Sequence, residues 1–155
     1  MYLFLKNLNM KKMGLDWGEK RIGIAISDEL LFFAHPLEII ENSSKTKSIL
    51  KNIIQKENID EVVVGLPITL RGEMGKQAIK TKEQVEETFK DMTDIKIKLK
   101  FWDERMSTRH ANRLLKEVGL RIKDRRKIKK LDDKIAASLI LQSYLNYLKR
   151  ENEEI

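Results

Sequence analysis

The sequence predicts a single α/β domain in which helices flank a mixed five-stranded sheet. Three short strand-like segments follow one another near the start of the chain, which is typical of an antiparallel meander. A continuous β-branched run at residues 62–64 then indicates a strand covered on both faces, and helical and strand patterns alternate after it. The 155 residues, 41% of them hydrophobic, are enough for one domain with one core.

The first two strands are expected at Lys12–Leu15 and Arg21–Ser27, joined by a turn at residues 17–20. In the second strand isoleucines alternate with small residues, so one face is bulky and the other lets a neighbouring element approach closely. Asp16 is expected at this turn. It is either an ordinary turn residue or the first acid of a site, and this stretch alone leaves both open.

The later elements follow from apolar periodicity and from turn residues. A third strand is expected at Leu31–Ile40, broken at His35-Pro36 as in an edge strand or a bulge. After it come a helix from Ser43-Ser44 to about Asn58, a strand at Glu61–Leu66, a helix at about Lys76–Met92, a strand at Ile95–Trp102, and helices at about residues 107–119 and 131–148. Residues 1–11 are expected to be an N-terminal extension, 12–150 the domain and 151–155 a frayed tail.

Composition excludes several kinds of chemistry. The chain has no cysteine, which rules out disulfides, thiolate zinc sites and a cysteine nucleophile, and it has only two histidines. A bound metal must therefore be held mainly by oxygen ligands, which favours Mg²⁺ or Mn²⁺. With neither a long apolar run nor a secretory pattern, the chain is expected to be soluble and cytoplasmic.

The net charge of +7 is concentrated in one segment. Residues 105–130 hold eleven lysines and arginines against two acids, a local charge of +9, so the rest of the chain sums to −2. Such a concentration is typical of a protein that binds a polyanion such as nucleic acid, although a solvated loop is the alternative. The candidate nucleic-acid contacts are Lys20, Arg21, Arg71, Arg105, Arg109, Arg125 and Arg126.

Acidic residues stand out on two further elements. Asp133 precedes the apolar positions of the last helix by three, four, seven and eight residues, so it lies on the stripe that faces the core. The alternative is that both acids only stabilise the helix N-terminus, Asp132 as the N-cap and Asp133 in the first helical turn. Asp103 and Glu104 follow the last strand and point to opposite faces, and alternation does not say which of them can join Asp16.

Three acids from distant parts of the chain could converge on one point. Carboxylate clusters of this kind bind Mg²⁺ or Mn²⁺, and a pair of such ions activates water and stabilises the leaving oxygen in phosphodiester cleavage. An acidic site beside a basic segment is consistent with this chemistry, because the basic residues would hold the nucleic-acid backbone.

Four stretches in order, GLDWGEKRIGIAISD, VVVGLP, WDERMST and DKIAASLILQSYL, resemble the YqgF family of RNase H-like proteins. Proteins of this family are described as Holliday junction resolvases and as pre-16S rRNA processing nucleases. The resemblance implies an RNase H-like fold, with Asp16, Glu104 and Asp133 as catalytic and metal-binding acids. It also implies that the Gly65–Pro67 loop and Arg105 support the site.

The function expected from the resemblance is a metal-dependent endonuclease that acts in 5′-end processing of pre-16S rRNA, in contact with structured RNA and pre-ribosomal particles. A first alternative is a Holliday junction resolvase acting on branched DNA, for which a symmetric homodimer would place two sites on two strands. A second is a non-catalytic RNA-binding factor in ribosome assembly.

Overall fold

The computed structural model describes residues 10–69, 71–105 and 125–153, and for residues 125–134 it describes the backbone alone. The elements are β1 (Lys11–Trp17), β2 (Arg21–Ser27), β3 (Ala34–Glu41), α2 (Thr46–Lys56), β4 (Ile59–Leu66), α3 (Lys76–Lys90), β5 (Lys98–Asp103) and α5 (Arg125–Glu153). The strands form one sheet in the order β3-β2-β1-β4-β5. The first three strands are antiparallel and the last two run parallel to β1, so the predicted mixed five-stranded sheet is confirmed.

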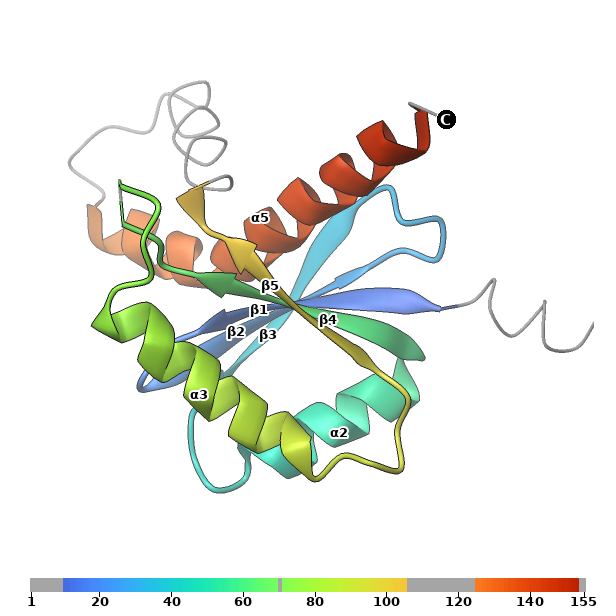
Figure 1. The fold of residues 1–155 in the computed structure, drawn as a ribbon, viewed down its shortest axis with the longest axis horizontal. Coiled ribbons are helices and arrows are strands. Elements are labelled where there is room, and N and C mark those ends of the chain that lie inside the picture. The colour runs from blue at the N-terminus through green and yellow to red at the C-terminus, as the bar shows by residue number, and fades with distance from the viewer. Residues whose placement is uncertain (1–9, 70, 106–124, 154–155) are drawn as a thin grey trace, which may run out of the picture.

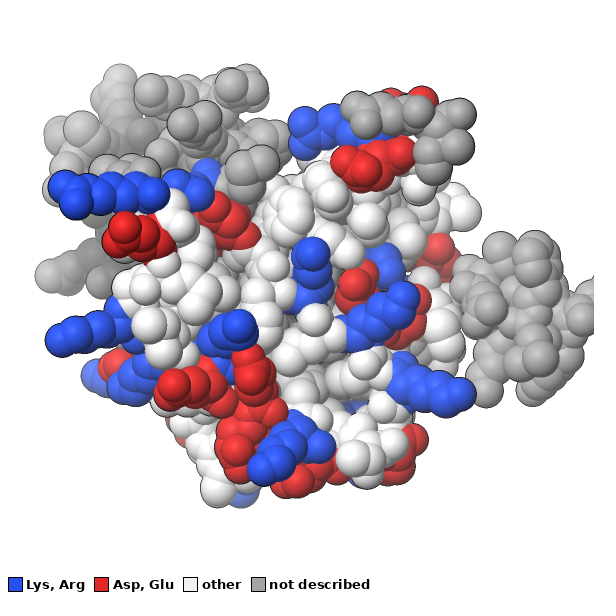
Figure 2. All heavy atoms as spheres, viewed as in Figure 1, with Lys and Arg blue, Asp and Glu red and all other residues white. Residues whose placement is uncertain are grey.

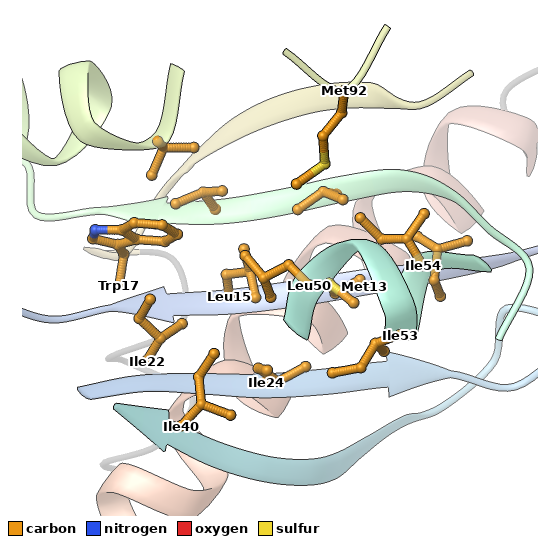
Figure 3. Close-up of a cluster of buried hydrophobic side chains, with 14 residues drawn as sticks. Met13, Leu15, Trp17, Ile22, Ile24, Ile40, Leu50, Ile53, Ile54 and Met92 are labelled. Carbon is orange, nitrogen blue, oxygen red and sulfur yellow. The ribbon is translucent and has the colours of Figure 1, made fainter. Parts of the chain in front are cut away.

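Helices cover both faces of this sheet (Figure 1). On one face α2 and α3 enclose the larger core, part of which is drawn in Figure 3, where Leu15 of β1 and Leu50 of α2 are fully buried. On the other face α5 packs against β1, β2 and β3 and more lightly against β4. Within the described part of the chain, no helix is long and apolar enough to cross a membrane.

Small residues let α5 lie close to the sheet. A Cβ added to Gly14 in β1 would lie 2.7 Å from Leu141 Cβ and 2.8 Å from the carbonyl oxygen of Ala137. Ala25, on the small-residue side of β2, is buried in the same cluster. The sequence correctly predicted that this side of β2 leaves room for a neighbouring element.

Some boundaries differ from the prediction. Asp16 lies inside β1, where it pairs with Gly23, and not in the turn. The third strand begins at Ala34 because residues 28–33 form a turn in which Leu31 adopts a φ of 61°. Helix α2 begins at Thr46, and Ser43 accepts a hydrogen bond from the Lys45 N–H instead of capping the helix.

The last helix is longer than apolar periodicity predicts. It begins at Arg125, six residues before the expected start, and continues to Glu153, through part of the predicted tail. The added residues are mostly lysine and arginine, which are good helix formers but carry no apolar stripe that would reveal them. The helix predicted at residues 107–119 lies outside the described residues.

Candidate active site

Asp16 lies near the end of β1 on the sheet face that α5 covers. It shares this face with Gly14, which touches α5, because side chains alternate along a strand. Its antiparallel partner is Gly23, which has no side chain to cover it. The carboxylate is therefore displayed where the neighbouring strand leaves space.

Glu104 reaches the same face from the end of β5. Its backbone N–H donates to the carbonyl of Leu66 at 3.0 Å, which continues the pairing of β4 and β5 by one residue. Its side chain lies over Gly65, where an added Cβ would be 2.9 Å from Glu104 Cγ and 3.0 Å from Oε1. Because β4 lies between β1 and β5, the Asp16 and Glu104 carboxylates are on the strands to either side of a glycine.

The two carboxylates influence one another electrostatically. The pKa of Glu104 is raised from 4.5 to about 7, first by burial and then by the negative charges of Asp16 and Asp103. A carboxyl with a pKa raised by burial and by a like charge is typical of a functional site. A cation near both groups would favour their ionised forms.

Asp103, the alternative to Glu104, has a different partner. The Arg105 guanidinium donates to Asp103 Oδ2 from Nη2 at 2.6 Å and from Nε at 2.9 Å. This hydrogen bonding holds the pKa of Asp103 below its usual range. Strand alternation left the choice between the two acids open, and the structure places Glu104 beside Asp16 and ties Asp103 to Arg105.

Arg105 also holds a loop next to the site. Its Nη1 donates to the carbonyl of Thr69 at 3.2 Å, in the loop that joins β4 to α3. Gly72 in the same loop has a φ of 82°, and a Cβ added to it would lie 3.9 Å from both terminal guanidinium nitrogens. The spacing of Asp103 and Arg105 in the sequence is consistent with a local ion pair. No sequence pattern indicates the contact of Arg105 with Thr69, because that contact depends on the parallel packing of β4 and β5.

The third predicted acid, Asp133, can be followed only along the backbone. It lies in α5 one turn before Ala137, whose carbonyl oxygen faces Gly14 of β1. Its side chain lies outside the described residues. Among the side chains that are described, no group of three acidic or imidazole residues is placed to hold a metal ion.

The candidate basic contacts are scattered around this end of the sheet. Lys20 and Arg21 are exposed at the β1–β2 turn, next to Asp16 in the chain, and Arg71 is exposed in the β4–α3 loop. Arg109 and the side chains of Arg125 and Arg126 lie outside the described residues.

Acidic side chains gather over α3 on the face shown in Figure 2, with lysines among them. The exposed acids of this helix include Glu83, Glu86 and Glu87. This mixed surface is therefore not the polyanion-binding surface that the net charge predicts.

A buried polar cluster anchors α5 at the other end of the strands. The Tyr144 hydroxyl donates to Glu61 Oε1 at 2.9 Å, and Lys12 Nζ lies 3.0 Å from the same oxygen. Burial, followed by the hydrogen bond to Glu61, raises the pKa of Tyr144. Sequence patterns do not reveal this contact, because a tyrosine in the apolar stripe of a helix carries no signal of its hydroxyl partner.

Comparisons with known proteins agree on one family. The family model described as "RuvX: Holliday junction resolvase" matches residues 10–147. A Halothermothrix orenii protein named "Putative pre-16S rRNA nuclease" is 41% identical over 141 residues, covering 89% of this chain and 96% of that protein. A Carboxydothermus hydrogenoformans protein of the same name is 44% identical over 140 residues, covering 89% of this chain and 97% of that protein.

Among solved structures, T. thermophilus RuvC in complex with a Holliday junction substrate is similar in fold. The TM-score is 0.60 at 13% sequence identity, covering 91% of this chain and 96% of that chain. At this identity the likeness shows the fold alone, and it confirms the RNase H-like fold that the sequence predicted.

Proposed function

The chain belongs to the RuvX family, also called YqgF, and we propose that it is a nuclease that hydrolyses phosphodiester bonds in 5′-end processing of pre-16S rRNA. The observation that carries the chemistry is the Glu104 carboxyl, held over Gly65 with its pKa raised by burial and by Asp16. The RNA substrate is proposed from the names of relatives about 40% identical over nearly nine-tenths of the chain.

The proposed catalytic residues are Asp16, Glu104 and Asp133. The first two come from the ends of β1 and β5 on the face that α5 covers, and the third lies in the turn of α5 that precedes its contact with Gly14. A strand, a helix and the residue that follows another strand would thus supply one acid each. Glu104 is held next to β4 by the hydrogen bond from its backbone N–H to the Leu66 carbonyl.

The donor set fits a hard divalent cation, Mg²⁺ or Mn²⁺, because carboxylate oxygens are the ligands that such ions prefer. Asp16, Glu104 and Asp133 would hold it, and it would supply activation of the attacking water and stabilisation of the leaving oxygen. The repulsion that raises the pKa of Glu104 also favours a cation at this place, since positive charge would stabilise both ionised carboxylates.

The neighbouring cations would position the substrate. Lys20 and Arg21 at the β1–β2 turn and Arg71 in the β4–α3 loop are exposed and could bind phosphate groups on either side of the acids. Arg105 would act indirectly, by holding the loop that carries Arg71 through its contact with Thr69. The basic residues 109, 125 and 126 are proposed to extend this contact to structured RNA in pre-ribosomal particles.

The test is cleavage of a precursor 16S rRNA leader and of a four-way DNA junction, at matched salt and with Mg²⁺ or Mn²⁺. We expect the wild type to cleave the leader and Asp16→Asn and Glu104→Gln to lose at least about a hundredfold in rate, because each removes one ionised ligand. Glu83→Gln, at an exposed acid of α3, is the matched control and should cleave like the wild type.

Holliday junction cleavage is the second candidate, favoured by the description of the family model and by the RuvC-like fold. Activity confined to the branched DNA would establish it in place of the RNA function. If Asp16→Asn and Glu104→Gln retained full function in ribosome assembly with unchanged Mg²⁺ dependence, a non-catalytic RNA-binding role would be correct instead.

A further inference from the structure

Large apolar side chains are exposed in the turn between β2 and β3 and near the start of β3. Leu30 is 74% exposed, Phe33 63%, Phe32 44% and Leu37 40%, and we call these four residues the β2–β3 tip. In Figure 1 this turn projects beyond the sheet beside the C-terminal half of α5. Exposed apolar residues that stand alone need no explanation, but a cluster of this kind marks a protein interaction surface.

The turn is ordered by its own hydrogen bonds, so the tip is a preformed surface. Asp28 Oδ1 accepts from the backbone N–H groups of Phe32 at 2.8 Å and Phe33 at 2.9 Å. Leu31 has a φ of 61°, a conformation that costs a leucine free energy and persists only when its surroundings fix it. A surface held in this way loses little conformational freedom when a partner binds.

Helix α5 fixes the same turn from the side. Gln142 Oε1 accepts from the Ala34 N–H and its Nε2 donates to the Phe32 carbonyl, both at 2.9 Å. Lys149 Nζ lies 4.2 Å from the centre of the Phe32 ring. The Gln142 side chain therefore holds the turn at two points, while Phe32 and Phe33 stay exposed.

A bulge presents the fourth member of the tip. In the pairing of β2 with β3, Ala25 faces Pro36 and Ile24 faces Glu38, so Leu37 is the extra residue. A bulge re-aims a side chain, and here it exposes a leucine. Because Pro36 has no N–H to donate, this edge is poorly suited to the addition of another strand, and the partner is expected on the apolar side chains instead.

The composition and charge of the surface indicate the partner. The four residues are large and apolar, and two of them are aromatic, a residue class enriched at the centre of protein interfaces. Glu29 in the turn and Glu38 next to Leu37 in β3 are exposed and disfavour a nucleic acid, whereas Lys149 of α5 lies over the Phe32 ring and is followed by the exposed Arg150. Acids on the turn and bases on the helix are complementary to each other.

We propose that the β2–β3 tip is the contact through which two copies of this chain associate about a two-fold axis. Such an axis brings the turn of each copy against α5 of the other. The acidic residues of each copy then face the basic residues of the other, and the apolar side chains of both copies pack between the two. Asp16 pairs with Gly23, five residues before Asp28 along β2, which puts the acids about 17 Å from the turn. Both sites therefore stay open to substrate in the dimer.

The test is sedimentation velocity of the full chain from about 1 to about 200 μM. We expect a monomer–dimer equilibrium in the micromolar range, and at least about a tenfold weaker association for Leu30→Glu and for Phe33→Glu, because each places a charge in the apolar contact. Ile79→Glu is the matched control, since Ile79 is 44% exposed on α3, and it should associate like the wild type.

A chain that is monomeric at every concentration would overturn the proposal, and the tip would then be left for a partner of another sequence. Dimerisation of Leu30→Glu and Phe33→Glu at wild-type strength would also overturn it, by placing the contact elsewhere. Circular dichroism checks that each variant folds. If Phe33→Glu does not fold, Leu30→Glu alone tests the proposal. The measurement needs no substrate, so its failure would leave the proposed nuclease function intact.

Discussion

At Glu104 the proposed metal-binding role and the stability of the fold oppose each other. Its carboxyl is partly buried beside Asp16, and burial raises its pKa to about 7. The folded state therefore binds a proton at Glu104 more tightly than the unfolded chain does. The ionised form that a cation needs is the form that the fold disfavours when no cation is present.

This opposition predicts the pH dependence of one substitution. Because the pKa of Glu104 is higher in the folded state, its ionisation lowers the free energy of unfolding as pH rises from about 4.5 to about 7. At about pH 8 Glu104→Gln should be more stable than the wild type by roughly 1–3 kcal/mol, and below about pH 4.5 the two should be equal.

Urea unfolding monitored by circular dichroism across this pH range checks the prediction. Glu83→Gln, at an exposed position of α3, provides the control. A constant difference between Glu104→Gln and the wild type at all pH values would contradict the linkage.

Gly65 is the residue that makes room for Glu104. A Cβ at this position would lie 2.5 Å from Ile140 Cδ1 and 2.9 Å from Glu104 Cγ, so the side chains of Ile140 and Glu104 must both shift. We expect Gly65→Ala to lower the free energy of unfolding by about 1–3 kcal/mol and to abolish nuclease activity. Gly75→Ala is the control, because the nearest atom to its added Cβ is 3.6 Å away. Thermal unfolding and the cleavage assay measure both effects, and full activity in Gly65→Ala would show that Glu104 need not lie where the structure has it.

At the scale of elements, the β4–α3 loop is tied by the Arg105 side chain to the residues that follow β5. Arg105 joins Asp103 to the carbonyl of Thr69, and the side chains of Arg105 and Asp103 are 42% and 29% exposed. Exposed ion pairs contribute little to the stability of a protein. The contact is therefore expected to order the loop locally without holding the fold together.

Substitution of Arg105 should separate loop order from stability. Arg105→Ala should change the free energy of unfolding by less than about 1 kcal/mol but increase amide hydrogen exchange in the loop and raise the KM for RNA. Arg105→Lys should not restore either property, because a lysine cannot reproduce the forked contacts of a guanidinium. Unchanged exchange in residues 71–75 of Arg105→Ala would rule out the role of Arg105 as a loop anchor.

Helix α5 is anchored to the sheet by a buried hydrogen bond as well as by apolar packing. The Tyr144 hydroxyl is the donor to Glu61, which also pairs with Lys12. Tyr144→Phe should lower the free energy of unfolding by about 1–2 kcal/mol, because Glu61 loses a partner in a buried position. Urea unfolding tests this against Tyr147→Phe, since the Tyr147 side chain is 39% exposed. Equal effects of the two substitutions would mean that the Glu61 contact contributes no stability.

At the scale of the whole molecule, the two ends of the sheet have different surfaces. The acids and the exposed cations lie where β1 and β5 end, and the apolar β2–β3 tip lies beyond the opposite end of β1 (Figure 1). Substrate binding and self-association would thus use separate regions of one small domain. The net charge of +7 would add long-range attraction for a polyanion, and it comes from residues 105–130, most of which lie outside the described part of the chain.

Binding of RNA should accordingly weaken as salt is raised. If about four phosphates are neutralised, affinity for a single-stranded leader should fall about fifty-fold between ~50 and ~200 mM salt. Fluorescence anisotropy with Asp16→Asn, which binds without cleaving, gives the slope of log affinity against log salt. An affinity that does not depend on salt would contradict a binding mode dominated by phosphate contacts.

The sequence by itself determined the sheet, the order of the elements and the family. Period-two alternation and the β-branched run at residues 62–64 specify strands locally, and four motifs in order carry the resemblance. The same patterns could not show that Arg125 begins the last helix, or that Leu31 takes a left-handed conformation, because neither depends on apolar periodicity.

Only the tertiary structure decided what lies next to what. Alternation left Asp103 and Glu104 equivalent, and packing separated them, because Gly65 leaves space for Glu104 while Arg105 binds Asp103. The contacts of Tyr144 with Glu61 and of Gln142 with the β2–β3 turn join residues more than eighty positions apart. Local patterns reflect the periodicity of one segment, whereas burial, pKa shifts and hydrogen-bond partners arise when distant segments meet.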